Sequence, residues 1–220
     1  MIWIALLLGS FVSGSIPFGL LIAKRRGVDI RCHGSGNIGA TNVGRVLGRR
    51  AGLTCFLLDF LKGLAPALVA GAATGLFAGR SIAPLLAGLW FGVAACAVLG
   101  HMYTPWARFK GGKGVATGLG ALLGIFPWLS GPVIAAALVW LVMVRIWKYV
   151  GIASCVAAFT IPIVLPIWVQ VLGAAEISEY WPFLVGSAVL AAVVVIKHRG
   201  NIRRTINGTE PKIGQRAPSE

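Results

Sequence analysis

Seven apolar segments dominate this chain and constrain its fold more than any other feature. A helix that crosses a bilayer needs about 20 apolar residues, and its backbone polar groups must be satisfied without water. The segments are 2–23, 51–77, 82–103, 114–126, 128–146, 150–172 and 181–196. With 57% hydrophobic and 12% charged residues, the composition lies far outside that of a soluble domain. The sequence therefore predicts an all-α integral membrane protein, built as one domain over residues 1–220 with a cytoplasmic tail at 205–220.

The distribution of basic residues favours a membrane crossing by all seven segments. The fourth is short enough to be a re-entrant or core helix instead. If all seven cross, the basic stretches 24–50, 108–113, 145–148 and 197–216 share one face. Arg80 is then the one basic residue of the opposite face, where Glu176 and Glu179 also lie and where Trp128 could serve as an interfacial anchor. The positive-inside rule thus predicts seven transmembrane helices, the N-terminus outside and the C-terminus in the cytoplasm.

The formal net charge of +14 fits this membrane topology better than it fits a nucleic-acid partner. Basic residues at the ends of apolar spans are the ordinary orientation signal of membrane proteins, so we expect no nucleic acid and membrane lipids as surroundings. Cysteines 32, 55, 96 and 155 lack the spacing of a metal site or a disulfide framework. We expect no metal, and the sequence leaves the oligomeric state open.

A glycine-spaced stretch at 34–45, GSGNIGATNVGR, has the composition of an anion-binding loop. Glycines such as Gly34 and Gly36 tolerate positive φ and allow backbone N–H groups to approach a ligand closely. The side-chain donors of the stretch are Ser35, Asn37, Thr41, Asn42 and Arg45. Because it contains no carboxylate, it is the electrostatic complement of a phosphate or an acyl oxyanion. Taken alone, it fits a flexible surface loop equally well.

Two further basic stretches make a functional site the better interpretation. Residues 109–117, FKGGKGVAT, place Lys110, Gly111, Gly112 and Lys113 at the start of the fourth apolar segment, where a helix N-terminus would offer free N–H groups. Residues 197–201, KHRGN, place His198 and Asn201 at the end of the last segment. If the seven-span topology holds, all three stretches meet on one side of the membrane.

Nucleotide-binding motifs do not account for these stretches. The spacing of Gly34, Gly36 and Gly39 satisfies G-x-G-x-x-G, but a strand and a βαβ unit must surround a dinucleotide fingerprint. A P-loop would need glycine at position 107 and Ser or Thr at Gly114. Mg²⁺ sites use carboxylates, which are missing here. We therefore expect no cofactor.

Three ionisable residues inside the apolar segments have a favoured structural interpretation. Asp59 and Lys62 stand one helical turn apart, so they can pair on one face and offset the cost of burying each charge. A structural pair is favoured over a catalytic one. His101, at the inner end of the third segment, is more often structural than in contact with a substrate.

Six motifs, in this order, resemble the bacterial acyl-phosphate:glycerol-3-phosphate acyltransferases, the PlsY family. They are SGSIPFG at 13–19, GSGNIGATN at 34–42, DFLKG at 59–63, GH at 100–101, FKGGKGVAT at 109–117, and HRGNI followed by NGTE. The resemblance covers nearly the whole chain. It implies a seven-span enzyme of the bacterial inner membrane whose active site faces the cytoplasm. It also implies that acyl phosphate and glycerol 3-phosphate are the substrates, and lysophosphatidic acid and phosphate the products, in an early step of phospholipid synthesis.

The resemblance also implies roles for the residues of the three stretches. The catalytic set is Ser35, Arg45, Lys113, His198 and Asn201. The substrate phosphates would be bound by Gly34, Gly36, Asn37, Thr41, Asn42, Lys110, Gly111 and Gly112. His198 is the one candidate in these stretches that titrates near neutral pH, so either His198 or the donor phosphate takes the proton of the attacking hydroxyl.

A rival class is an anion transporter, whose site would also combine broken helices with basic residues. Such a site lies near the bilayer midplane, between repeated halves of the chain. Here the basic motifs gather at one face and no internal repeat is evident, so the enzyme is favoured. A purely structural scaffold would leave all three donor-rich stretches unexplained.

Overall fold

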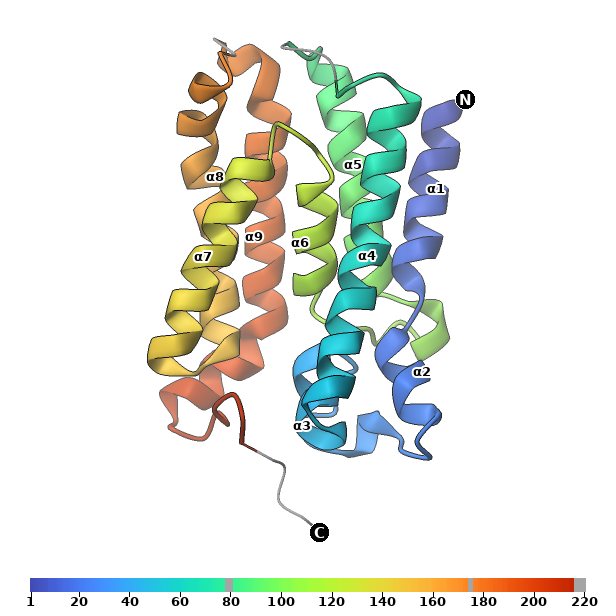
Figure 1. Ribbon diagram of the computed structural model, residues 1–220, viewed down its shortest axis with the longest axis vertical. Coiled ribbons are helices and arrows are strands. Elements are labelled where there is room, and N and C mark those ends of the chain that lie inside the picture. Colours follow the sequence, from blue (N-terminus) through green and yellow to red (C-terminus); the bar gives the residue numbers. More distant parts are fainter. Residues whose placement is uncertain (78–80, 174–175, 216–220) are drawn as a thin grey trace.

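The computed structural model describes residues 1–77, 81–173 and 176–215, and every regular element within those ranges is a helix (Figure 1). The elements are α1 Ile2–Ser15, α2 Phe18–Lys24, η1 Ile30–Cys32, α3 Ala40–Leu47, α4 Arg49–Ala73, α5 Pro84–Met102, η2 Pro105–Ala107, α6 Val115–Leu123, α7 Ser130–Trp147, α8 Val150–Val171 and α9 Ile177–Ile206. The predicted all-α architecture is confirmed for the described residues.

Six stretches in the described ranges are long and apolar enough to cross a membrane, instead of the seven expected. They are Ile2–Lys24, Arg49–Ala73, Pro84–Ala107, Ser130–Trp147, Val150–Val171 and Ile177–Ile206. The fourth apolar segment forms only α6, which ends at Leu123 because Gly124 and the following Pro127 interrupt the helical pattern. The length of an apolar segment thus overestimated the length of this helix.

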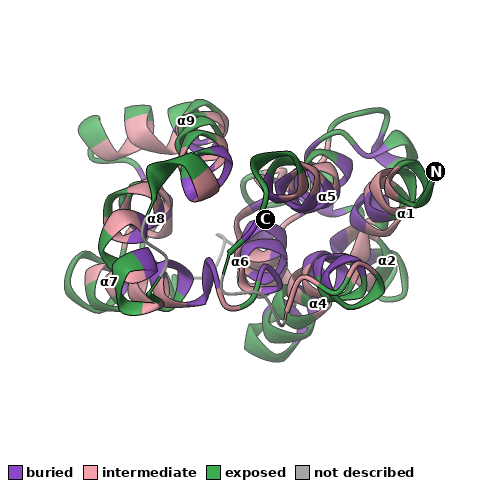
Figure 2. Cartoon of the chain, turned by 90° about the horizontal axis from the view of Figure 1, so that it is seen from above, coloured by how far each residue is buried: buried purple, intermediate pink, exposed green. Residues whose placement is uncertain are grey.

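The direction of α6 is nevertheless that of a crossing segment. Figure 1 shows α6 at mid-height of the bundle, running from the side of α3 towards the opposite end, with its connection to α7 continuing in that direction. Consequently α5 and α7 run in the same direction. Viewed from above, α6 lies between the group α7, α8 and α9 and the group α1, α4 and α5 (Figure 2), and it contacts α4, α5 and α7.

Two glycines hold this short helix against α4. A Cβ at Gly63 would overlap the Thr117 carbonyl oxygen, and a Cβ at Gly120 would overlap the Phe60 carbonyl oxygen. Small residues allow such close approach of two helix backbones, which is how helices gain packing energy inside a membrane. The position of α6 is therefore fixed by backbone contact and does not depend on its length.

The first apolar segment is broken into α1 and α2 instead of forming one continuous helix. Pro17 lacks an N–H and its ring clashes with a helical continuation, so the carbonyl groups before it lose their intrahelical partners. The Ser15 oxygen accepts from Thr104 Oγ1 at 2.5 Å, and the Ile16 oxygen accepts from Lys62 Nζ at 2.7 Å. These bonds from α4 and the α5–η2 turn stabilise the break.

Lys62 also forms the ion pair with Asp59 that the sequence predicted. Lys62 Nζ lies 2.8 Å from Asp59 Oδ1, and each side chain is only 3% exposed. His101 Nδ1 lies 3.7 Å from the same carboxylate oxygen. The predicted pairing is confirmed, and Lys62 links the carboxylate of α4 to the broken end of α1, as a structural role would require.

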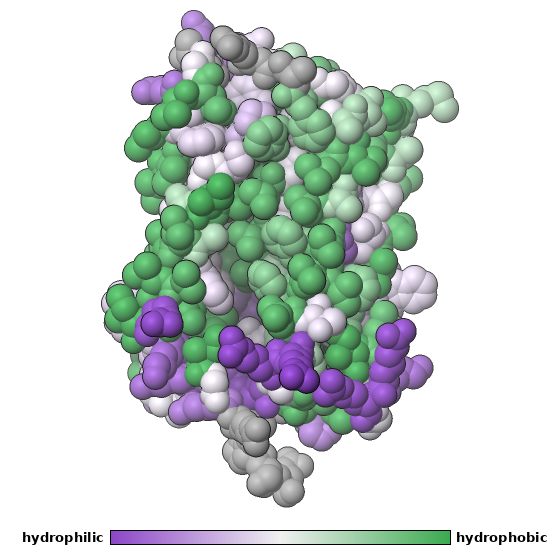
Figure 3. Space-filling model, in the orientation of Figure 1, coloured by the Kyte–Doolittle hydropathy of each residue, from purple (hydrophilic) through white to green (hydrophobic). Residues whose placement is uncertain are grey.

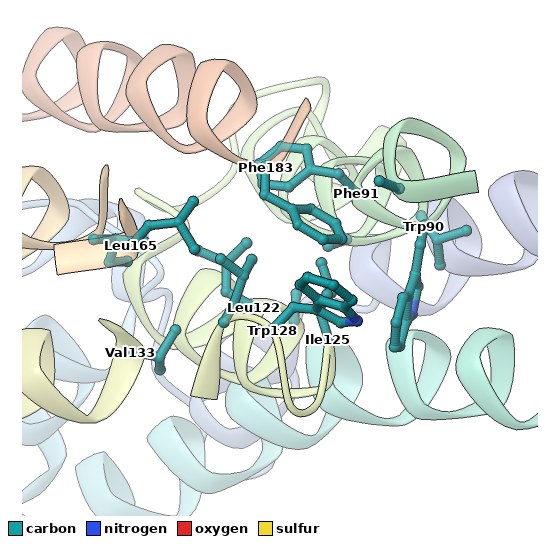
Figure 4. Packing of buried hydrophobic residues seen from close by; sticks show 14 of the residues in the cluster. Trp90, Phe91, Leu122, Ile125, Trp128, Val133, Leu165 and Phe183 are labelled. Atoms are coloured by element: carbon teal, nitrogen blue, oxygen red, sulfur yellow. The ribbon is translucent and has the colours of Figure 1, made fainter. Parts of the chain in front are cut away.

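At the end of the bundle opposite α3, aromatic and aliphatic side chains from helices α4 to α9 fill the interior (Figure 4). Trp128 is 2% exposed and its ring lies 6.0 Å from that of Phe183. The interpretation of Trp128 as an interfacial anchor is therefore wrong, because its ring packs inward on α9.

The surface separates into an apolar body and a hydrophilic end. Figure 3 shows apolar side chains over most of the height of the bundle and hydrophilic atoms gathered at the end that carries α3. Arg80, the one basic residue expected on the opposite face, lies outside the described residues. A broad apolar body of this kind needs lipid around it.

The buried ion pair yields the first testable prediction. Asp59→Leu should lower the free energy of unfolding by about 3–5 kcal/mol, because it leaves Lys62 buried without its counter-charge. The double variant Asp59→Leu/Lys62→Met should recover much of that loss, as it removes both charges. Denaturant unfolding in detergent measures both values. Equal losses in the single and double variants would contradict a stabilising role for the pairing.

Candidate functional site

A cavity of about 440 Å³ opens at the hydrophilic end and continues between the helices. Its lining comes from the loop before α3, from α3 and α4, from His101 of α5, from both sides of the α6 start, and from α7, α8, α9 and the chain after α9. Polar side chains line one part and apolar side chains the other. The three donor-rich stretches found in the sequence all contribute to the polar part.

The loop before α3 is organised by the buried side chain of Asn42. Its Oδ1 accepts from the Ser35 N–H at 2.9 Å, and its Nδ2 donates to the carbonyl oxygens of His33 at 3.0 Å and Asn37 at 2.9 Å. Asn37 in turn accepts from the Gly39 N–H at 2.9 Å. The amide of Asn42 is thus engaged within the loop, so a role in loop shape suits it better than the predicted phosphate contact.

The glycines of the loop serve its conformation. Gly34 and Gly36 have φ of 60° and 68°, values that favour glycine. Neither lines the cavity, and a Cβ on Gly34 would overlap the Asn42 side chain. Direct phosphate contact by these two glycines, as the sequence suggested, is not what the geometry favours.

Ala40 and Thr41 at the start of α3 line the cavity, together with Ser35 of the preceding loop, and Arg45 lies one turn further along the helix. The first N–H groups of a helix have no partner within it, and the helix dipole makes this end favourable for an anion. Burial lowers the pKa of Arg45, with Glu210 acting in the opposite direction, but a guanidinium remains charged over the physiological range.

The start of α6 faces the same cavity from the other side. Gly114, with φ of 80°, precedes the helix, and Val115 and Ala116 line the cavity beside Lys113. Burial lowers the pKa of Lys113 to about 8, an effect that Glu210 opposes and Arg204 reinforces. Two helix N-termini and two cationic side chains therefore converge on one space.

Helix α9 supplies the remaining donors. His198 Nδ1 donates to the Val194 carbonyl oxygen at 2.8 Å, since a carbonyl can only accept, and its Nε2 stays available to the cavity that His198 lines. Asn201 Oδ1 accepts from Lys113 Nζ. Gly151 of α8 packs directly on the Asn201 side chain, where a Cβ would overlap it, so α8 fixes the position of this amide.

Two site residues were missed by the sequence analysis, Arg204 and Glu210. Glu210 Oε1 accepts from Asn201 Nδ2 at 2.5 Å and its Oε2 accepts from Arg204 Nε at 2.7 Å. Both residues line the cavity. A signal was present, because Glu210 is the only acidic residue in the basic stretch 197–216 and belongs to the NGTE motif.

Part of the predicted cytoplasmic tail at 205–220 therefore belongs to the helical bundle. Thr205 and Ile206 complete α9. The chain then turns back, and the Ile213 N–H donates to the Lys148 carbonyl oxygen at 2.9 Å. This contact holds Glu210 over the cavity.

Lys110, Gly111 and Gly112 do not line the cavity, contrary to expectation. The Gly111 and Gly112 N–H groups donate to the carbonyl oxygens of Met102 and His101, at 3.1 and 3.2 Å, so they are not free for a ligand. Lys110 is exposed. These residues instead shape the turn that delivers Lys113 and the start of α6.

The apolar part of the cavity runs along the helices away from the charged end. Its lining includes Leu119, Leu122, Ala136, Trp140, Ala158 and Leu190. The Trp140 ring is held by a hydrogen bond from its Nε1 to Ser154 Oγ at 3.2 Å. A cavity that is cationic at its mouth and apolar beyond suits an amphiphile with a phosphate head and a hydrocarbon tail.

The fold and cavity together define a helical membrane protein with a site for anionic, lipid-like ligands. A family model described as glycerol-3-phosphate acyltransferase matches residues 4–208. A glycerol-3-phosphate acyltransferase of Geotalea daltonii is 46% identical over 94% of this chain and 95% of its own length. One of Geobacter sulfurreducens is 45% identical, over 91% of this chain and 92% of its own. This chain belongs to the glycerol-3-phosphate acyltransferase family.

Solved structures agree with this assignment. The chain is similar to the crystal structure of PlsY, an integral membrane glycerol 3-phosphate acyltransferase, in its glycerol 3-phosphate form, with a TM-score of 0.81, 36% identity, and coverage of 97% of this chain and 96% of that one. The lysophosphatidic acid form matches with a TM-score of 0.78. The resemblance to the PlsY family seen in the motifs is confirmed, and with it the integral membrane fold.

Proposed function

We propose that this protein transfers a fatty acyl group from an acyl phosphate to glycerol 3-phosphate, giving lysophosphatidic acid and phosphate. Acyl transfer to glycerol 3-phosphate follows from the family, and it is an early step of phospholipid synthesis. The observation that carries the proposal is the cavity itself, where the stretches around Arg45, Lys113 and Asn201 converge beside an apolar extension.

The polar part of the cavity has the charge to hold two phosphates, that of glycerol 3-phosphate and that of the acyl donor. Arg45 offers a planar fork suited to phosphate oxygens, and Lys113 offers a compact charge. The N-termini of α3 and α6 add N–H groups, and the hydroxyls of Ser35 and Thr41 add further donors. No metal ion or cofactor is part of this proposal.

The reaction needs one nucleophilic attack and one leaving group. The glycerol hydroxyl oxygen attacks the acyl carbonyl carbon, the bond from that carbon to the phosphate oxygen breaks, and phosphate leaves with the electron pair. The same cationic groups that bind the phosphates also stabilise the negative charge that develops on the carbonyl oxygen. Positioning and electrostatic stabilisation therefore supply most of the acceleration.

The hydroxyl proton passes to an oxygen of the donor phosphate in this proposal. Two carboxylates line the cavity among the described residues, and both are engaged: Asp59 with Lys62, and Glu210 with Asn201 and Arg204. His198 Nε2 orients the hydroxyl or a phosphate oxygen. The proton acceptor is thus already beside the attacking group as part of the substrate.

For the membrane arrangement, we propose seven crossings with the N-terminus outside and the C-terminus in the cytoplasm of a bacterial inner membrane. The parallel direction of α5 and α7 supports a crossing by the α6 segment, and the gathering of hydrophilic side chains at the α3 end supports a cytoplasmic active site. Residue 210 lies at this same end.

Tags report this topology directly. Accessible cysteines or fusion reporters at residues 30, 110 and 147 should be cytoplasmic, and one at residue 177 should be outside, because the basic stretches flank the first three positions. Labelling in intact cells, compared with permeabilised cells, separates the two sides. Opposite locations for 110 and 147 would remove the α6 crossing.

The donor is tested with purified protein, palmitoyl phosphate and glycerol 3-phosphate, by measuring lysophosphatidic acid and phosphate. Turnover should need neither Mg²⁺ nor a nucleotide, and palmitoyl-CoA should not replace the acyl phosphate, since the sequence contains no nucleotide-binding motif. Comparable rates with palmitoyl-CoA would overturn the proposed donor.

The pH dependence should identify Lys113 as a charged binding group. Because its pKa is lowered to about 8, its charge is present below that pH and is lost above it, so kcat/KM should fall as the pH rises through this range. Lys113→Met should lower kcat/KM by roughly tenfold to a hundredfold below pH 8 and flatten the alkaline decline.

The matched control for Lys113→Met is Lys110→Met, which removes the same charge three residues away, outside the cavity. It should leave the position of the alkaline decline unchanged. Arg45→Lys should weaken turnover substantially, because a point charge cannot reproduce the fork. An alkaline decline that persists in Lys113→Met would assign the titration to another group.

A further inference from the structure

The apolar part of the cavity has a measurable depth, because two of its walls, α8 and α9, are antiparallel helices in contact. Gly151 of α8 packs on Asn201 of α9, which places these two residues at the same level beside the charged end. Along α8 the cavity-lining face continues to Ile161, and along α9 it passes Ala191 and continues one turn further to Ser187. Ile161 and Ala191 lie ten positions from that reference level, which corresponds to about 15 Å at the rise of an α-helix, and Ser187 lies about 21 Å from it.

Ile161 and Ala191 therefore lie at nearly the same depth on facing walls. Ile161 is 8% exposed and Ala191 is 1% exposed, so the surrounding helices hold both side chains in place at the cavity wall. The two side chains differ in size, since the branched chain of Ile161 occupies space that the methyl group of Ala191 leaves open.

Beyond Ile161 on α8 and Ser187 on α9 the interior is filled. Leu165, one turn further along α8, and Phe183 of α9 are 0% exposed, and Val133 of α7 is 1% exposed. All three belong to one buried cluster with Ile161 and Leu122, and Figure 4 shows Leu165, Leu122 and Val133 close together with Phe183 nearby. Interiors packed in this way do not admit additional methylenes without strain. The apolar part of the cavity thus has a closed end.

We propose that Ile161, together with Ala191 and Ser187, sets the longest acyl chain that the enzyme accepts. This inference rests on the proposed function, with the acyl chain extending from the charged end towards the packed layer. The cavity contacts every methylene of a chain that ends between Ile161 and Ser187, whereas a longer chain must displace the cluster around Leu165 and Phe183. Selectivity for chain length then follows from the depth of the cavity and not from the charged residues.

The experiment is a competition among lauroyl, myristoyl, palmitoyl and stearoyl phosphate in one reaction, with the lysophosphatidic acid products resolved by mass spectrometry. Product ratios report selectivity directly and do not depend on the amount of folded enzyme. Ala191→Leu should lower the share of the longest chain that the wild type uses by roughly tenfold, since it fills the cavity one turn before its closed end. Ile161→Ala should raise the share of longer chains, by about fourfold for each added methylene that gains contact.

Ala192→Leu is the matched control. It makes the same change at the neighbouring position of α9, but Ala192 is exposed and does not line the cavity. Its product ratios should stay within about twofold of the wild type. If Ala191→Leu does not fold, the same measurement on Ile161→Ala, with a shift in the opposite direction, decides the question.

Opposite shifts in the two cavity variants support the proposal. Unchanged ratios in the folded cavity variants, or an equal shift in Ala192→Leu, would overturn it and leave the proposed function intact. Failure of the wild type to form lysophosphatidic acid from any of the four donors would instead reject the proposed donor.

Discussion

The buried ion pair of Asp59 and Lys62 is the interaction on which the rest of the site depends. Lys62 reaches the Ile16 carbonyl oxygen at 2.7 Å, so it stabilises the break that lets α2 leave the axis of α1. Gly19 of α2 then packs on the Ile38 carbonyl, and Ile38 lies at the end of the loop, two residues before α3 begins. A charge pair in the second long helix thus supports the loop that brings Ser35 and Arg45 to the cavity.

Asp59 supports the other half of the site in the same way. Its carboxylate lies 3.7 Å from the His101 ring, and that ring packs on Gly112, whose N–H donates to the His101 carbonyl at 3.2 Å. Lys113 and the start of α6 follow immediately. Burying these charges is costly unless each has a partner, and here each partner also fixes part of the cavity wall. A change that destabilises the ion pair should consequently also distort the site.

The sequence was sufficient for the helical class, the Asp59–Lys62 pair and the convergence of three polar stretches, because hydropathy, residue spacing and charge are local signals. It was insufficient where a tertiary contact decides the outcome. The position of α6 depends on backbone contact at Gly63 and Gly120, and the engagement of the Gly111 and Gly112 N–H groups depends on carbonyls at the end of α5. Glycine spacing alone cannot distinguish a glycine that contacts a ligand from one that shapes a turn.

Glu210 explains how so cationic a site can be stable before substrate binds. Arg45, Lys113 and Arg204 repel one another, and the pKa of Lys113, lowered by burial to about 8, reflects this environment. Glu210 offsets part of that charge and limits the lowering of the pKa of Lys113. One carboxylate, however, cannot balance three cations. Two substrate phosphates would complete the balance and favour the charged form of Lys113. In the proposed reaction the excess positive charge would attract the two phosphates. The contacts of Glu210 with Asn201 and Arg204 reduce the repulsion among the cations before the phosphates bind.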